Sequence, residues 1–410
     1  MADRIVVSGR GLVTPIGVGL EENTESLKHG KTGTVFVPEW RELGLDAQVA
    51  GLSDHDVECP VLNQKNKRFM SVNSKMAVAA AYEALIEAGF TMETLPHDMA
   101  VINGCGGSAY SEVYANAAAF IESKRIRKVS PFAVPRIMPS SAVANLSLVF
   151  GLTGESYDIS SACTSSAQAI IAGARLIASG EYDTVLVGGS EEVSWQQALG
   201  FNAMRALSHS YNDCPHRASR PFDKGRDGFV LGEGAGILVL ERESCALARG
   251  HRPHAVLSGF AANSNATDMV IPNADSSADL MMRAIRMAGL KPEDIGYINT
   301  HGTATPVGDP VELDSIKRVF NASRNVAINS TKSMTGHMIG AAGAVEAIFS
   351  TLMLEHSFLC PTANLDDPAD EFAWADLIRE TRENVDVKHA LSNSFGFGGS
   401  NACLVFSKWE

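Results

Sequence analysis

The stretch Tyr157-Asp158-Ile159-Ser160-Ser161-Ala162-Cys163-Thr164-Ser165-Ser166 joins a strand-like segment to a small-residue helix pattern that continues over residues 167–174. It places the Cys163 thiol at the start of a helix, where unpaired N–H groups and the helix dipole favour the nucleophilic thiolate. Far downstream, His301 and His337 each lie in a short glycine-containing loop, as expected when a cysteine meets its partners only in the folded chain. The pattern predicts covalent catalysis on an acyl group.

Outward from this stretch, short apolar runs alternate with alanine-rich helical patterns. Such alternation predicts an α/β fold with a largely parallel sheet. In the first part of the chain the predicted strands are 5–8, 100–103, one at Tyr157, and 184–187; the predicted helices are 76–88, 142–149 and 167–179. A hairpin-like pair is predicted from residues 226–230 and 236–240.

The pattern starts again after a helical segment at 244–249 and a break at 250–253. The second series has predicted strands at 255–259, 297–299, 326–329, 390–392 and 402–406, and predicted helices at 278–288, 309–320 and 341–354. We therefore predict two architecturally duplicated halves, 1–250 and 251–410, without close sequence identity between them. Because ligands collect at the carboxyl ends of strands in open α/β sheets, the Cys163 and His337 loops should meet in one cleft.

Composition narrows the class of protein. The 410 residues are too many for one ordinary core, and 45% hydrophobic with 20% charged residues is typical of a globular protein. A net charge of −13 argues against nucleic-acid binding. The seven cysteines form no C-x-x-C pair, which argues against a disulfide framework and a zinc site. No signal-peptide pattern or membrane-length apolar run is present, so we expect a cytoplasmic protein without a membrane segment.

Two basic clusters stand out against this acidic background. The first holds Lys65, Lys67 and Arg68, and the second holds Lys124, Arg125, Arg127 and Lys128. On their own they are either solvated loop charges or a patch that meets an acidic partner.

Three further segments carry candidate chemistry. Residues 299–312 place His301 directly after a predicted strand, followed by alternating threonines, although a lone histidine is more often structural. Residues 329–346 place His337 between Lys332 and Glu346. Instead of belonging to a site, Lys332 could be an exposed charge and Glu346 an ordinary helix carboxylate. Residues 392–401 form a glycine-rich turn whose backbone N–H groups can point at a ligand oxygen.

Taken together, these motifs resemble the β-ketoacyl-ACP synthases, the condensing enzymes of fatty-acid synthesis. The resemblance rests on S-S-A-C at 160–163, N-T-H-G-T-A-T-P-V-G-D at 299–309, T-K-S-M-T-G-H-x-x-G-A-A-G at 331–343, and N-S-F-G-F-G-G-S-N at 393–401. It covers nearly the whole chain. Residues 68–71, 211–213, 218–223 and 268–272 are more similar to synthase I, with synthase II the close second.

The resemblance implies an acyltransferase with a thiolase-like, five-layered αβαβα fold, usually a homodimer, that needs no metal and no organic cofactor. It implies that Cys163 takes the acyl chain from an acyl carrier protein, and that His301 and His337 stabilise the enolate left when malonyl-ACP loses carbon dioxide. The backbone N–H groups of Cys163 and Phe397 would form the oxyanion hole. The resemblance also implies that Lys332 is a catalytic residue that supports His301 and Glu312 electrostatically. Glu312 and Glu346 would be supporting residues, and Glu346 would orient the His337 loop.

It also implies binding positions. Thr303 and Thr305 would bind the pantetheine arm, and Gly107 and Met138 fall in the acyl-pocket region. The basic clusters would dock the acidic carrier protein through Lys65, Arg68, Lys124 and Arg127, because complementary charge steers two otherwise repelling acidic proteins together.

Three related classes are alternatives. A thiolase would need a second catalytic cysteine in the final glycine-rich loop, where this chain has Phe397, with Cys403 only in the following strand. A chain-length-factor-like partner lacks the nucleophile, whereas Cys163 is present here. A polyketide ketosynthase is harder to separate, and the absence of acyltransferase or carrier segments favours fatty-acid elongation.

Overall fold

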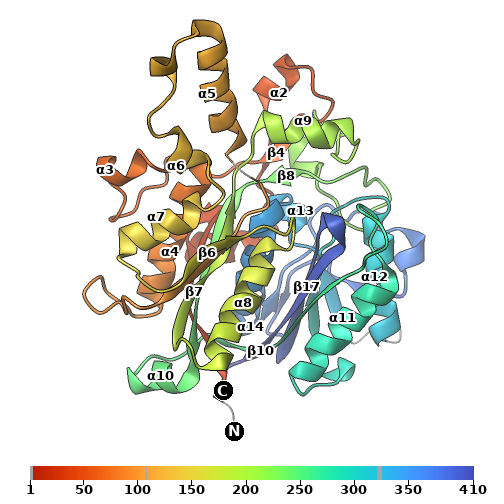
Figure 1. Ribbon diagram of the computed structural model, residues 1–410. Helices are drawn as coiled ribbons and strands as arrows, with labels where there is room; N and C mark the ends of the chain where they lie inside the picture. The colour runs from red at the N-terminus through yellow and green to blue at the C-terminus, as the bar shows by residue number, and fades with distance from the viewer. Residues whose placement is uncertain (1–2, 108, 321–325) are drawn as a thin grey trace.

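The computed structural model describes residues 3–107, 109–320 and 326–410, so the first two residues of the predicted first half lie outside it. Its elements stack as five layers (Figure 1). Helices α4 (Val72–Glu87) and α7 (Ser141–Phe150) cover one half of the sheet, and α11 (Ala274–Met287) and α12 (Gly308–Phe320) cover the other. Helices α8 (Ser165–Ser179) and α14 (Ala342–His356) lie between the halves. The predicted αβαβα arrangement is confirmed.

The two halves have the same strand order, which reveals the duplication. The first half runs β1 (Ile5–Thr14), β9 (Gly234–Arg242), β7 (Thr184–Glu191), β5 (Ala100–Gly104), β6 (Ser156–Ile159). The second half runs β10 (Ala255–Ser264), β17 (Ser400–Lys408), β16 (His389–Phe395), β11 (Tyr297–Asn299), β12 (Ala327–Asn329), and ends at β14 (Asp376–Leu377). A short antiparallel pairing of β1 with β10 joins them.

The prediction of a largely parallel sheet is only partly right. Strands β5, β6 and β7 are parallel, as are β11, β12, β14 and β16, but the central strands β1, β9, β10 and β17 pair antiparallel. A short turn at 396–399 joins β16 to β17, and parallel strands would need a crossover of a dozen residues or more.

The predicted hairpin of 226–230 with 236–240 is wrong. Strand β9 already has both edges paired, with β1 and with β7, so no edge is free for residues 226–230. The short β8 (Leu231–Gly232) pairs instead with β4 (Val49–Gly51), which also pairs with β3 (Thr34–Phe36).

The halves also share a packing detail. Both β1 and β10 carry an irregularity at a Ser-Gly pair, next to Gly9 and Gly259. A Cβ on Gly9 would lie 2.0 Å from the carbonyl oxygen of Ala84 in α4, and one on Gly259 would lie 2.3 Å from that of Ala284 in α11. Glycine therefore lets each helix backbone touch its strand at equivalent places, which a side chain would prevent.

The remaining elements surround this frame. Helix α14 is buried along almost its whole length and shares the largest apolar core with α8. The other helices are α1 (Leu20–Lys28), α2 (Pro38–Glu42), α3 (Gln64–Lys67), α5 (Tyr110–Ser123), α6 (Ala133–Ile137), α9 (Trp195–Ala203), α10 (Glu243–Ala248) and α13 (Lys332–Thr335). Short strands β2 (Gly17–Val18), β13 (Phe358–Leu359) and β15 (Arg382–Glu383) complete the fold. Within the described ranges, no helix combines the length and apolarity needed to cross a bilayer.

Candidate active site

Cys163 lies in the turn between β6 and α8, directly before the helix N-cap residue Thr164. Ala162 adopts a left-handed conformation with φ of 52°, which brings the chain sharply from strand to helix. The Ser165 hydroxyl ties this turn: it accepts the N–H of Ser161 at 2.9 Å and donates to the carbonyl of Ala162 at 2.7 Å. The sequence prediction of a thiol at a helix start is confirmed.

His301 follows β11 in the second half. The carboxylate of Glu312, on α12, accepts the backbone N–H of His301 at 2.8 Å and that of Gly302 at 2.7 Å. Glu312 is buried, so these two charge-assisted bonds fix the loop that carries His301.

His337 lies between α13 and a short 3₁₀ turn, Ile339–Ala341. Its backbone N–H donates to the carbonyl of Val230 at 2.7 Å, and its own carbonyl accepts the N–H of Gly232 at 2.9 Å. The edge of its ring packs against Phe229, with centroids 5.5 Å apart. Strand β8 of the first half therefore holds a residue of the second half.

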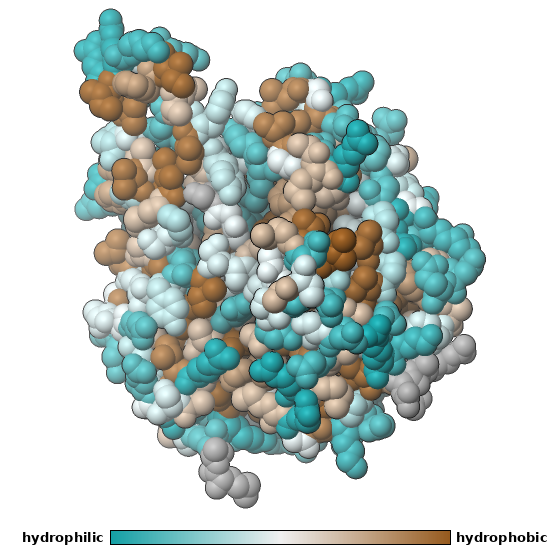
Figure 2. Space-filling view, turned by 45° about the vertical axis from the view of Figure 1, so that its right-hand side comes forward, coloured by the Kyte–Doolittle hydropathy of each residue, from teal (hydrophilic) through white to brown (hydrophobic). Residues whose placement is uncertain are grey.

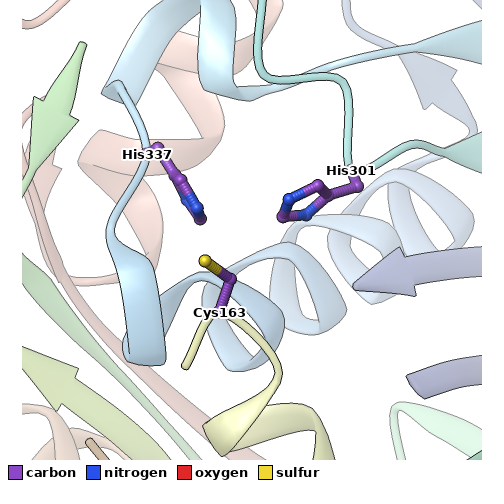
Figure 3. A group of neighbouring side chains, drawn as sticks. All are labelled: Cys163, His301 and His337. Carbon is purple, nitrogen blue, oxygen red and sulfur yellow. The ribbon is translucent and has the colours of Figure 1, made fainter. Parts of the chain in front are cut away.

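These loops bring the sulfur and both imidazoles together (Figure 3). One ligand atom from each of Cys163, His301 and His337 lies within 4.8 Å of the others, and the two rings meet edge to face at 5.1 Å. All three line a cavity of about 410 Å³. The predicted meeting of the Cys163 and His337 loops is confirmed.

The electrostatics of the thiol differ from the prediction. Burial raises the pKa of Cys163 to about 12, and the opposing influences of the Lys332 charge and of the Phe397 and Cys163 backbone N–H groups do not overcome it. We expected the helix terminus to favour a thiolate, but loss of hydration disfavours the charged form more strongly. Cys163 therefore rests as a thiol.

Both histidines are neutral. Burial lowers the pKa of His301 and of His337 well below the usual value, and the nearby charge of Lys332 lowers both further. Within the described residues, Nδ1 of His301 and both ring nitrogens of His337 are buried without a hydrogen-bond partner. A neutral imidazole offers one N–H donor, so the site holds donors with no acceptor of their own.

Lys332 is the cation of the site, and its direct partner is Glu346. The two buried side chains form an ion pair, and burial raises the pKa of Glu346 to about 7 while Lys332 opposes that shift. Glu346 was expected to orient the His337 loop, but its carboxylate contacts Lys332 instead. The charge of Lys332 lowers the pKa values of His301 and His337 and opposes the rise in the pKa of Glu312, and its catalytic support of these groups stays a prediction.

Thr303, Thr305 and Phe397 also line the cavity. The two threonine hydroxyls lie 3.1 Å apart. The Phe397 loop is held from outside, because the N–H of Gly398 donates to the carbonyl of Met269 at 2.7 Å. The 268–272 segment, together with this loop, forms part of the cavity wall.

The structure does not bring Gly107 and Met138 to this cavity. A Cβ on Gly107 would meet the side chains of Glu191, Tyr110 and Gln197. Met138 is half-buried at the end of α6. The space predicted for the acyl chain therefore lies outside the cavity seen in a single chain.

The predicted docking residues are all exposed. Lys65 lies on α3 and Arg68 ends it, while Lys124 and Arg127 follow α5. Arg136 connects the two regions, donating to the Arg68 carbonyl at 2.9 Å and to Glu112 of α5 at 3.0 Å. In Figure 1, α3 lies at the left and α5 projects above it, with α6 between them.

Sequence reasoning missed several residues of the site. Phe201 and Phe229 line the cavity and pack against each other at 5.2 Å, and Ile339 forms another part of its wall. Glu191, buried at the end of β7, also went unnoticed. Its signal in the sequence was weak, because Gly-Gly-Ser at 188–190 separates the predicted strand 184–187 from the glutamate pair 191–192.

Five layers built from duplicated halves, with a buried cysteine thiol facing two neutral histidines, are the features of the thiolase-like condensing enzymes. The chain belongs to the β-ketoacyl synthase family: the model of the N-terminal domain, "Beta-ketoacyl synthase, N-terminal domain", matches residues 2–246, and that of the C-terminal domain matches residues 254–366.

Known proteins resemble the chain over its whole length. It is 40% identical to 3-oxoacyl-[acyl-carrier-protein] synthase 1 of Haemophilus influenzae, covering 99% of each chain. It is 41% identical to the corresponding synthase 2 of Vibrio harveyi, covering 99% of this chain and 98% of that one. The crystal structure of a β-ketoacyl synthase from Burkholderia phymatum matches with a TM-score of 0.93 at 35% identity, covering both chains fully.

Proposed function

We propose that the chain is a 3-oxoacyl-[acyl-carrier-protein] synthase that elongates fatty acids by decarboxylative Claisen condensation. The observation that carries this proposal is a buried thiol beside two neutral imidazoles. Among the described residues, Nδ1 of His301 and both ring nitrogens of His337 are buried without a hydrogen-bond partner. Such a site supplies a nucleophile and two hydrogen-bond donors without a charged acid or base. It suits an enolate, which needs donors at its oxygen.

The first step loads the nucleophile. The Cys163 sulfur attacks the thioester carbonyl of an acyl carrier protein, a new C–S bond forms, and the carrier thiolate leaves with the Cys163 proton. Negative charge on the carbonyl oxygen is met by the backbone N–H groups of Cys163 and Phe397, both of which lie at the sulfur. Removing one such donor typically lowers a rate by about 10²–10³-fold.

The second step uses the histidines. Malonyl thioester enters with its carbonyl oxygen between His301 and His337, and its carboxylate leaves as carbon dioxide. The electron pair of the broken C–C bond becomes an enolate whose oxygen accepts hydrogen bonds from the two imidazoles. Thr303 and Thr305 bind the pantetheine arm beside them.

The third step joins the chains. The enolate carbon attacks the acyl carbonyl on Cys163, and the tetrahedral intermediate collapses by expelling the Cys163 sulfur as a thiolate, which takes a proton from solvent water. The product is a 3-oxoacyl chain on the second carrier protein. Lys332 stabilises negative charge in each step through its position among the three groups.

The carrier protein docks on the exposed basic residues Lys65, Arg68, Lys124 and Arg127. None of the four forms an ion pair within the described residues, so their charge is available to an acidic partner. Charge complementarity mainly raises the association rate, which salt then lowers.

The functional unit is a homodimer. Strand β6 ends the sheet with one edge unpaired among the described strands. The α5 region of the same half projects at the upper left of Figure 2 and exposes large apolar residues: Tyr114, Phe120, Ile121 and Ile126. Open edges and apolar patches are normally covered. A partner on this face would also complete the acyl pocket near Gly107 and Met138.

The boundary between the two halves falls between residues 250 and 251. The cysteines are free thiols, which fits a protein that works in the reducing cytoplasm.

The distinction between a type 1 and a type 2 synthase depends on which acyl chains the enzyme accepts. Relatives of types 1 and 2 match at 40% and 41% identity, so overall identity does not separate them. The ishigamide ketosynthase/chain length factor matches at 30% identity with a TM-score of 0.92. The higher identity favours fatty-acid elongation over polyketide extension.

Mass spectrometry tests the proposal. Incubation with an acyl-carrier thioester should add acyl mass to Cys163, and a series of saturated and unsaturated chain lengths should then define the substrate. Acylation at another residue, or none, would overturn the mechanism.

A further inference from the structure

Glu191 connects the two halves beside the catalytic cavity. It ends β7, is 1% exposed, and its carboxylate accepts three backbone N–H groups. Oε2 accepts those of Gly106 at 2.8 Å and Gly340 at 3.0 Å, and Oε1 accepts that of Gly107 at 3.0 Å. Gly106 and Gly107 follow β5 of the first half, whereas Gly340 belongs to the loop of His337.

The two glycine turns touch backbone to backbone at this point. A Cβ on Gly340 would lie 2.1 Å from the N atom of Gly106. The neighbouring Ile339 has φ of 40°, a left-handed conformation that strains a β-branched residue. Ile339 also lines the catalytic cavity, so the strained segment forms part of the active-site wall. A conformation of this kind persists only where surrounding contacts enforce it.

His337 depends on its backbone for orientation. Neither ring nitrogen has a hydrogen-bond partner in the described part of the chain, so no polar contact of the side chain sets the ring angle. One side of the loop is bound to Val230 and Gly232 through the His337 peptide. The other side is bound to Glu191 through Gly340.

We propose that Glu191 is a positioning residue for the decarboxylation step, holding the His337–Gly340 loop against the Gly106–Gly107 turn so that Ile339 and the His337 ring keep their places at Cys163. The inference rests on the proposed function. Both carboxylate oxygens of Glu191 must accept hydrogen bonds, because the three backbone groups that face them, at Gly106, Gly107 and Gly340, are all N–H donors.

The same carboxylate acts on the nucleophile. Its charge is among the influences that raise the pKa of Cys163. The other titratable groups facing it are the Cys105 thiol, the Tyr110 hydroxyl and the Glu192 carboxylate, and no cation bonds to it within the described ranges. Burial raises the pKa of Glu191 to about 7, so its charge should be largely absent at pH 6 and present at pH 8.5.

Glu192 provides a matched control. It is the next residue, is also buried, and accepts from the Ser111 hydroxyl at 3.0 Å and the Asn73 N–H at 3.4 Å. Both partners belong to the first half, and neither bonds to the His337 loop in the part of the chain that the structure describes. Glu192→Gln therefore removes a buried carboxylate directly after the same strand without releasing that loop.

The experiment compares Glu191→Gln with Glu192→Gln by carbon dioxide release from malonyl-ACP and by alkylation of Cys163 with iodoacetamide. In Glu191→Gln the amide nitrogen opposes N–H donors, so kcat for release should fall about 10- to 100-fold with KM little changed, as for ~1 Å misplacements. Alkylation should become faster at pH 8.5 and not at pH 6, because the lost negative charge no longer opposes thiolate formation. Loss of a residue with a merely structural role would not slow carbon dioxide release and at the same time speed the alkylation of Cys163 at pH 8.5.

Equal behaviour of the two variants would overturn the inference. If the wild-type chain releases no carbon dioxide, the proposed function fails, while unchanged Cys163 alkylation in Glu191→Gln would separately reject the inference. Should Glu191→Gln fail to fold, Glu191→Asp keeps the charge but is too short to span both turns. It should lose carbon dioxide release without faster alkylation, and full release in Glu191→Asp would reject the role.

Discussion

The loops after β6 and β12 occupy equivalent places in the two halves but carry different chemistry. Residues 160–164 run directly from β6 into α8 and leave Cys163 at the helix start. Residues 330–341 first form α13 and a 3₁₀ turn before α14, and so hold Lys332 and His337 on a separate scaffold. The short connection in the first half leaves a single candidate nucleophile, Cys163, beside backbone N–H groups. The long connection in the second half places two side chains, Lys332 and His337, around that sulfur.

In the proposed mechanism this difference divides the reaction between the halves. The first half would supply the covalent step at Cys163, and the second would supply the donors for decarboxylation, His301 and His337. Both kinds of group rest uncharged, because burial disfavours the thiolate and the imidazolium alike. The mechanism therefore needs no proton transfer between the Cys163 thiol and the histidines before the reaction. Substitutions in one half should then impair acyl loading or decarboxylation without impairing the other step.

Cys163→Ala should give the largest effect. Without the sulfur no acyl chain is held, so condensation should fall by at least about 10³-fold, the scale on which catalytic nucleophiles act. Release of carbon dioxide from malonyl-ACP should continue, because the two histidines are untouched. Radiolabelled product and carbon dioxide assays check this, and loss of both activities together would show that the halves do not act separately.

His337→Ala or His301→Ala should give the reverse pattern. Each removes one donor to the enolate oxygen, so carbon dioxide release should fall by about 10²–10³-fold. Acyl mass on Cys163 should still accumulate, because the histidines are not bases for the thiol in this scheme. The exposed His216 gives the control variant His216→Ala, for which both readouts should match the wild type. Failure of acylation would make a histidine the base.

Lys332→Met should destabilise the protein. It leaves Glu346 buried without its cation, and breaking a buried pair from one side typically lowers the free energy of unfolding by about 3–5 kcal/mol. Lys332→Met combined with Glu346→Leu should recover most of that loss. Urea unfolding measures both, with Lys28→Met of the surface pair as control. A single variant as stable as the wild type would contradict the charge arrangement of the second half.

The site was predictable where sequence position alone determines geometry. Cys163, His301 and Lys332 follow strands that lie parallel in their halves, so their loops had to reach the same edge of the sheet. The strand at 297–299 agrees with β11 residue for residue. The glycine-rich loop at Phe397 was found for the same reason, since it follows β16.

What escaped prediction depends on partners distant in sequence. Glu191 binds Gly106 and Gly340, 85 and 149 positions away, and nothing near it in sequence reveals them. The thiol pKa of Cys163 depends on burial by loops from both halves. The duplication itself was predicted from the order of the elements. The packing detail shared by Ser8-Gly9 and Ser258-Gly259 was not predicted, because the spacing from each glycine to its matching helix differs between the halves.

The pH dependence of Cys163 alkylation tests the resting state of the first half. With a pKa raised to about 12, the thiolate fraction should grow tenfold per pH unit and show no plateau between pH 7 and 10. The iodoacetamide rate at the Cys163 peptide should therefore rise about 100-fold from pH 7 to pH 9. A plateau near pH 8 would show that the helix terminus outweighs burial after all.

Removing metal should have the smallest effect. The ligand atoms of Cys163, His301 and His337 lie within 4.8 Å of one another, a spacing that also suits zinc. The Lys332 cation beside them opposes a divalent ion, and a bound metal would occupy the thiol and both donors at once. Dialysis against a chelator should leave condensation and carbon dioxide release unchanged, and added zinc should inhibit both. Activity lost on chelation and restored by zinc would instead make the three side chains one metal site, and the division of chemistry between the halves would fail.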